Sequence, residues 1–106
     1  MHTLVIRGDL VRQHPWLPAS LYKAFCQAKE MALQRMGESG ALPHALPWLL
    51  AEWEETKALM GPDPWPYGVA ANRKTLETLT RYAFEEGLAP KRLRAEDMFA
   101  ETLHQT

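Results

Sequence analysis

Four histidines and one cysteine are the side chains best suited to acid–base, nucleophilic or metal chemistry in this chain. The histidines, His2, His14, His44 and His104, are widely separated, and none has the short spacing to another that zinc sites use. Cys26 lies within a helical pattern of apolar residues, which favours a buried structural thiol over a nucleophile. The sequence therefore predicts no metal site, and it identifies no cofactor.

One histidine remains a candidate for catalysis. His2 begins the only strand-like segment of the sequence, and the ends of strands commonly carry site residues. For His14, His44 and His104 we expect surface or hydrogen-bonded roles.

The most distinctive segment is 62–74, in which three alternating prolines lead through Trp65 and Tyr67 into a helix start. Alternating prolines stiffen the backbone and exclude helix. The free N–H groups of a helix start, with Arg73 and Lys74 nearby, could hold a carboxylate or phosphate. An alternative is purely structural, because such a segment can simply pack a connector against the core.

The elements that must position these residues follow from hydrophobic spacing. Residues 2–7 have strand composition and are followed by a break. Spacings of three and four predict main helices at about 16–36, 48–60 and 69–86, each ended by a glycine. A helical turn at 9–14 and a short last helix at 95–103 complete the prediction. The predicted fold is mostly α, with one N-terminal strand, three main helices and a short C-terminal helix.

The same spacing predicts which residues are buried. The stripe on 16–36 consists of Leu21, Phe25, Ala28, Ala32 and Met36. The later helices contribute Leu49, Trp53 and Leu59 or Met60, and then Leu76, Leu79 and Ala83. Arg73, Glu77, Arg81 and Glu85 form a charged ladder on the opposite, solvated face of the last main helix.

Composition limits the class of protein. The 106 residues suit one domain, numbered 1–106, and a hydrophobic content of 46% with 24% charged residues is typical of a globular chain. A net charge of −1 argues against a general nucleic-acid binder. No apolar stretch is long enough to predict a membrane span, and no secretion signal is present at the start.

Several motifs occur in an order that resembles a known family. They are Met-His-Thr-Leu-Val-Ile-Arg at 1–7, His-Pro-Trp at 14–16, Ser-Leu-Tyr-Lys-Ala-Phe at 20–25, Leu-Pro-Trp at 46–48, Leu-Met-Gly at 59–61 and Trp-Pro-Tyr-Gly-Val-Ala-Ala-Asn-Arg-Lys-Thr-Leu-Glu at 65–77. Nearly the whole chain resembles the carboxy-terminal part of 4,5-dihydroxyphthalate decarboxylases. That family in turn resembles type 2 periplasmic solute-binding proteins, which are built from two α/β lobes.

The resemblance implies a partial domain, namely the terminal segment of one lobe, because members of the family are several times longer. It implies decarboxylation of 4,5-dihydroxyphthalate to 3,4-dihydroxybenzoate in the cytoplasm, with an aromatic dicarboxylate as the ligand of the complete protein. Such chemistry needs a proton donor and groups that bind carboxylates. His2 could be the donor, and Tyr67, Asn72 and Arg73 could bind substrate.

Two further expectations concern partners. A single strand cannot satisfy its own backbone groups, so we expect 3–6 to pair outside the chain and to produce a dimer or higher oligomer, or to join a missing lobe. We expect the isolated chain to be inactive.

The alternative function is a non-catalytic solute-binding or helical oligomerisation module.

Overall fold

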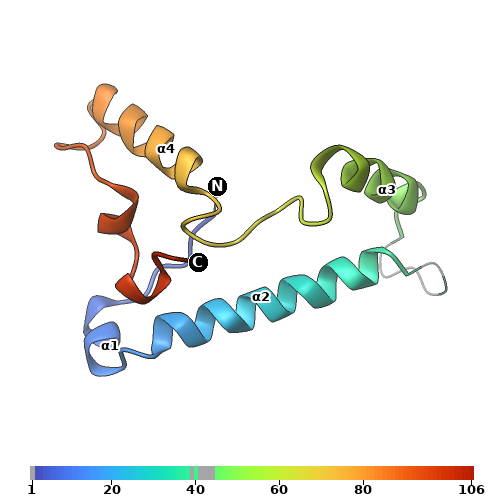
Figure 1. Cartoon of the computed structure of the whole chain (residues 1–106), viewed down its shortest axis with the longest axis horizontal. Coiled ribbons are helices and arrows are strands. Elements are labelled where there is room, and N and C mark those ends of the chain that lie inside the picture. Colours follow the sequence, from blue (N-terminus) through green and yellow to red (C-terminus); the bar gives the residue numbers. More distant parts are fainter. Residues whose placement is uncertain (1, 39, 41–44) are drawn as a thin grey trace. The chain divides into compact units, whose positions relative to one another are not determined.

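The computed structural model describes residues 2–38, 40 and 45–106 (Figure 1). Its helices are α1 (Gly8–Gln13), α2 (Leu17–Met36), α3 (Leu49–Met60) and α4 (Arg73–Glu85), followed by two 3-10 helices, η1 (Ala95–Met98) and η2 (Glu101–Leu103). The prediction of a mostly α chain is confirmed. Contacts divide the chain into two compact units: unit 1 contains 1–21 and 67–106, and unit 2 contains 22–66.

The predicted strand at the amino terminus is wrong for the described residues. Residues 2–7 form neither helix nor strand, and no other described segment is a strand. The physical reason is that a strand exists only when a second strand shares its backbone hydrogen bonds. The described chain contains no such second segment.

Glycines follow the ends of helices as the sequence predicts, and a proline lies at the start of one of them. Pro18 lies in the first turn of α2, where its missing N–H removes no helical hydrogen bond. Gly61 follows α3 with a φ of +85°, and its N–H donates to the carbonyl of Lys57 at 2.9 Å. Gly87, with a φ of +72°, follows the end of α4. Both glycines have a positive φ, which L side chains rarely adopt.

Two predicted helices differ from the structure. Helix α4 begins at Arg73 and not at 69 or 70. Val69 and Ala70 lie in a turn, and their N–H groups donate to Thr106. The helix predicted at 95–103 is two separate 3-10 helices. Phe99 and Ala100, which separate them, have ψ angles of 152° and 138° and so are not helical.

The core of unit 1 forms where α4 and η1 contact each other. Val69, Leu76 and Ala95 are buried, and Phe99 and Leu103 pack against them. After α4 the chain turns at Gly87 and returns to bring η1 against the helix (Figure 1). The predicted burial of Leu76 is confirmed, whereas Leu79 is 47% exposed.

Among the described residues of unit 2 the buried hydrophobic one is Trp53, as predicted, with 6% of its surface exposed. The ammonium of Lys57 lies 5.6 Å from the centre of its ring. On α2, Lys29 donates to the carboxylate of Asp63 at 2.7 Å and to the carbonyl of Trp65 at 3.2 Å. These contacts tie the proline-rich segment to α2.

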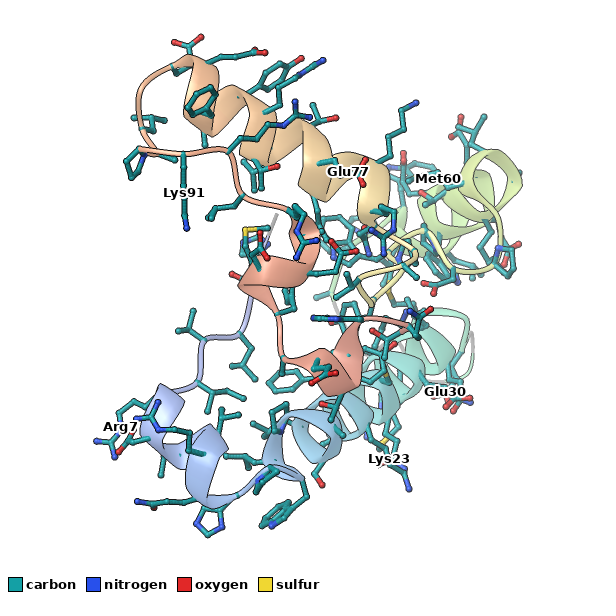
Figure 2. All side chains as sticks on the ribbon, turned by 60° about the vertical axis from the view of Figure 1, so that its left-hand side comes forward. Arg7, Lys23, Glu30, Met60, Glu77 and Lys91 are labelled. Atoms are coloured by element: carbon teal, nitrogen blue, oxygen red, sulfur yellow. The ribbon has the colours of Figure 1, made fainter. Side chains whose placement is uncertain are left out.

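The predicted core stripe of α2 is wrong in most positions. Phe25 is 47% exposed, Ala28 and Ala32 are exposed, and only Pro18 is buried on this helix. Leu59 and Met60 of α3 are exposed as well. The side chains of Lys23 and Glu30 extend outward from α2 (Figure 2). An amphipathic pattern indicates a face suited to burial, but burial also needs a second surface, and the described residues of unit 2 do not cover Phe25, Ala28 or Ala32.

Candidate functional site

The turn before α4 contains two of the predicted site residues, Tyr67 and Asn72, and the third, Arg73, begins the helix. Gly68 has a φ of +115°, and a Cβ added there would lie 2.5 Å from the carbonyl carbon of Thr106. The N–H of Ala70 donates to the carbonyl of Thr106 at 2.6 Å, and that of Val69 donates to its hydroxyl at 3.3 Å. The N–H groups of Val69 and Ala70, in the segment predicted to hold an anion, therefore already donate to oxygens of Thr106.

Asn72 and Tyr67 lie on either side of that turn. The side chain of Asn72 donates to the carbonyl of Gly68 at 2.9 Å, which closes the turn ahead of α4. Tyr67 is exposed at the start of the turn. Both residues also make interactions beyond this hydrogen bond.

Arg73 is held by carboxylates. Its guanidinium forms a short ion pair with Glu96 on η1 and lies 3.8 Å from Glu77, one turn along α4. The hydrogen bond and charge of Glu96 raise the pKa of Arg73, and the hydrogen bond from Arg73 lowers the pKa of the Glu96 carboxyl. A substrate carboxylate could reach this guanidinium only in competition with Glu96.

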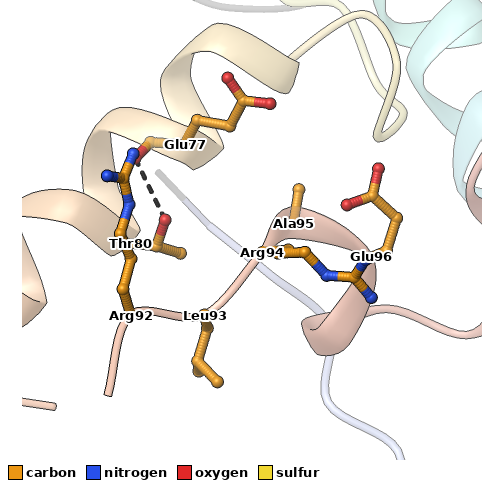
Figure 3. Close-up of a pocket in the computed structure, with 7 residues that line it drawn as sticks. All are labelled: Glu77, Thr80, Arg92, Leu93, Arg94, Ala95 and Glu96. Atoms are coloured by element: carbon orange, nitrogen blue, oxygen red, sulfur yellow. Dashed lines mark hydrogen bonds between the residues drawn. The ribbon is translucent and has the colours of Figure 1, made fainter. Parts of the chain in front are cut away.

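A surface pocket of about 330 Å³ lies beside this ion pair (Figure 3). The hydroxyl of Thr80, on α4, donates to the carbonyl of Glu77 at 3.1 Å. Leu93 and Ala95 supply apolar surface. The residues that line the pocket come from α4, from the chain between α4 and η1, and from η1: Glu77, Thr80, Arg92, Leu93, Arg94, Ala95 and Glu96.

The arginines of this pocket differ in their partners. Arg94 is paired with Asp97 at 2.9 Å, and the backbone N–H of Arg94 also donates to that carboxylate at 3.0 Å. These hydrogen bonds lower the pKa of Asp97 to about 2. No ion pair joins Arg92 to another described residue. Arg92 is thus the pocket guanidinium best placed to bind an added carboxylate, although it is not among the site residues predicted from the sequence.

The predicted catalytic histidine is not brought to this pocket. His2 is exposed and lines neither the pocket nor the apolar groove described next. His14 lies 5.8 Å from the ring of Trp16, and a ring nitrogen of His104 lies 3.0 Å from the carbonyl oxygen of Phe99. His44 lies outside the described residues. Cys26 is half-buried rather than fully buried. Among the residues described, no cluster of three or more potential ligands could hold a metal.

A second concavity of unit 1, which we call the apolar groove, has a volume of about 330 Å³. Residues 3–6 form part of its wall. Leu76 and Leu79 of α4 line it, together with Met98, Phe99 and Leu103 from the two 3-10 helices and the chain between them. The groove carries little polar chemistry and suits apolar side chains of a partner better than a reactive substrate.

Comparison with known proteins supplies the remaining evidence. No family model matches the chain. The chain is 38% identical over 99 residues to 4,5-dihydroxyphthalate decarboxylase of Comamonas testosteroni. The match includes 93% of this chain and 30% of that protein. None of the described helices has both the length and the apolar character of a membrane span.

The resemblance predicted from the motifs is thereby confirmed. Nearly the whole chain is similar to 4,5-dihydroxyphthalate decarboxylase, and it spans about 30% of the length of that relative.

Proposed function

We propose that this chain supplies one part of a carbon–carbon lyase that converts 4,5-dihydroxyphthalate to 3,4-dihydroxybenzoate and CO₂. The observation that carries the proposal is the 38% identity over 99 residues to an enzyme of that name. Because the chain spans 30% of that enzyme's length, we expect it to release no CO₂ alone and to act only with the remaining part of a decarboxylase. We place this activity in the cytoplasm.

The proposed reaction replaces one ring carboxylate by a proton. The ring hydroxyls donate electrons, an acid protonates the carbon that bears the carboxylate, and CO₂ leaves as aromaticity returns. In this proposal His2 is the proton donor, and Tyr67, Asn72 and Arg73 contact the substrate. Arg73 would exchange Glu96 for a substrate carboxylate, and Arg92 beside it could bind the second carboxylate.

A chimera tests the proposal. The matching 99-residue region of the Comamonas enzyme is replaced by that of this chain, and CO₂ release from 4,5-dihydroxyphthalate is measured. We expect activity from the chimera and none from the 106 residues alone. A chimera that melts cooperatively and binds the dicarboxylate without releasing CO₂ would contradict the proposal.

Paired substitutions in the same chimera separate the proposed roles. Arg73→Gln should raise KM about tenfold or more, since hydrogen bonds to charged groups contribute about 1.5–3 kcal/mol. Arg81→Gln is the matched control, because Arg81 belongs to the same ladder on α4 and pairs with Glu85 at 3.9 Å. His2→Gln should lower kcat with little effect on KM.

The alternative is a non-catalytic solute-binding or helical oligomerisation module. It is favoured by the many exposed apolar side chains of α2 and α3 and by the engagement of Arg73 with Glu96. Calorimetry of the chimera with aromatic dicarboxylates distinguishes the two functions, because this module would bind without turnover.

A further inference from the structure

Residues 3–6 have backbone groups without hydrogen-bond partners. Among the residues described, no N–H or carbonyl of this segment takes part in a hydrogen bond, although Arg7 directly after it accepts two at the start of α1. Val5 is 87% exposed and Leu4 is 57% exposed. Threonine, valine and isoleucine favour strands, so this segment has the composition of a strand but not its partner.

The apolar groove is continuous with this segment. Leu4 and Ile6 lie on the wall of the groove, and the half-exposed Leu79 and Met98 lie elsewhere in its lining. A strand that pairs with 3–6 presents side chains on alternate faces, about 7 Å apart along one face. One face of such a strand could therefore cover the exposed residues of the groove while its backbone pairs with 3–6.

We propose that the occupant is residues 3–6 of a second copy of this chain, paired antiparallel about a two-fold axis. Pairing centred on Val5 as a hydrogen-bonded pair would satisfy the backbone groups along one edge of 3–6 in both copies through the same surface, as two-fold dimers require. The inference does not depend on the proposed enzymatic function.

Charge and sequence favour self-pairing. Proteins usually protect an exposed edge with lysine, proline or an inward charge, and 3–6 contains none of these. The nearest charge, Arg7, is neutralised by Asp9 at 3.0 Å, which reduces repulsion between two copies. No other segment of these 106 residues has comparable strand composition, so among the segments of this chain the best matched strand is 3–6 of a second copy.

The size of the groove sets the expected affinity. About a dozen residues line it, roughly half of the 20–30 residues that one side of a standard interface contributes. We therefore expect a weak dimer whose population changes with concentration, with a dissociation constant of micromolar order or weaker.

Sedimentation velocity of the purified chain over a wide concentration range tests the proposal. Val5→Pro removes the N–H donor of an exposed residue outside the helices and should raise the dissociation constant at least tenfold without altering the helical circular dichroism. Val5→Thr keeps both the N–H and the β-branch and should dimerise like the parent. Leu59→Lys, at an exposed apolar position of α3, controls for non-specific apolar association and should have no effect.

Amide hydrogen exchange provides a second readout at the residues concerned. Protection of 3–6 should increase with concentration in the parent chain and not in Val5→Pro. A chain that is monomeric at all concentrations, or a dimer unaffected by Val5→Pro, would refute self-pairing. If protection appears only after the Comamonas enzyme lacking its matching region is added, the occupant is that polypeptide and self-pairing is wrong.

Discussion

Two arginines hold η1 through charged hydrogen bonds at the surface, one from α4 and one from the residue directly before η1. Arg73 reaches from α4 to Glu96, and Arg94 binds Asp97 three residues further along the chain. Exposed ion pairs usually contribute little, but hydrogen bonds that hold a carboxylate in place also restrict the turn that carries it. The position of Ala95 in the core of unit 1 therefore depends on polar contacts on both sides.

The lowered pKa of Asp97 predicts a specific acid sensitivity. A carboxyl whose pKa falls from 3.8 to about 2 on folding stabilises the folded state above its unfolded pKa and loses that contribution as the pH falls through its folded pKa. Urea unfolding at several pH values between 5 and 2 should show a smaller loss of stability for Asp97→Asn than for the parent chain.

The control for this measurement is Glu86→Gln. Glu86 is exposed and forms no ion pair with another described residue, so its substitution should leave the pH profile unchanged. Equal slopes for Asp97→Asn and the parent chain would show that Asp97 does not govern this pH range.

Individual site residues were only partly predictable. The spacing of Arg73 and Glu77 predicts their contact on α4, because positions i and i+4 share a helix face. The stronger partner, Glu96, is 23 residues away in sequence and on a separate turn, so helical periodicity could not identify it. Arg92 was missed as a site candidate for the same reason: its pocket forms only when the connector returns along α4.

At the scale of elements, the turn at Gly68 connects the last residues to the start of α4. Helix starts usually use a side chain to cap their N–H groups, but Asn72 makes no such capping bond to α4 and instead closes the preceding turn. Oxygens of Thr106 satisfy the N–H groups of Val69 and Ala70. The approach of Thr106 is possible because position 68 has no Cβ.

Gly68→Ala should therefore destabilise the protein more than Gly87→Ala. Both glycines have positive φ, and placing a Cβ in left-handed backbone costs about 1–2 kcal/mol. Only at position 68 would the new Cβ meet Thr106 and break hydrogen bonds, each contributing about 0.5–1.5 kcal/mol. Urea unfolding should give losses of about 2–4 kcal/mol for Gly68→Ala and about 1–2 kcal/mol for Gly87→Ala. Equal losses would show that the contact with Thr106 does not stabilise the turn.

The helices themselves were largely predictable from local signals, whereas the strand and the buried faces were not. Apolar spacing and glycine positions predict α2 and α3 to within about a residue of their observed ends. Pairing and burial depend on a second surface. Phe25 lies on the predicted helix but is exposed, and Leu4 lies in a predicted strand that does not form among the described residues.

At the scale of the whole molecule, exposed apolar side chains occur together with a net charge near zero. Among the described residues seventeen large hydrophobic side chains are exposed, and the formal charge of the chain is −1 with an isoelectric point near 6.4. Net charge makes copies of a protein repel one another in solution, and this chain has very little net charge near neutral pH. Association of any kind should therefore be strongest close to the isoelectric point.

Static light scattering at constant ionic strength tests this expectation. Scattering should reach a maximum near pH 6.4 and fall by pH 8.5, as the chain becomes more negative and copies repel one another. A profile that does not change with pH would show that apolar contacts alone control association.

Because of where the four tryptophans lie, tryptophan fluorescence reports differently on the two units. Trp16, Trp48 and Trp65 are at least 62% exposed, whereas Trp53 is 6% exposed. Fluorescence that acrylamide quenches poorly, and that is emitted at shorter wavelength, should therefore come from Trp53 and report on unit 2 alone. The core of unit 1, built around Val69, Leu76 and Ala95, contains no tryptophan, so its unfolding could pass unnoticed in a fluorescence experiment that circular dichroism would detect.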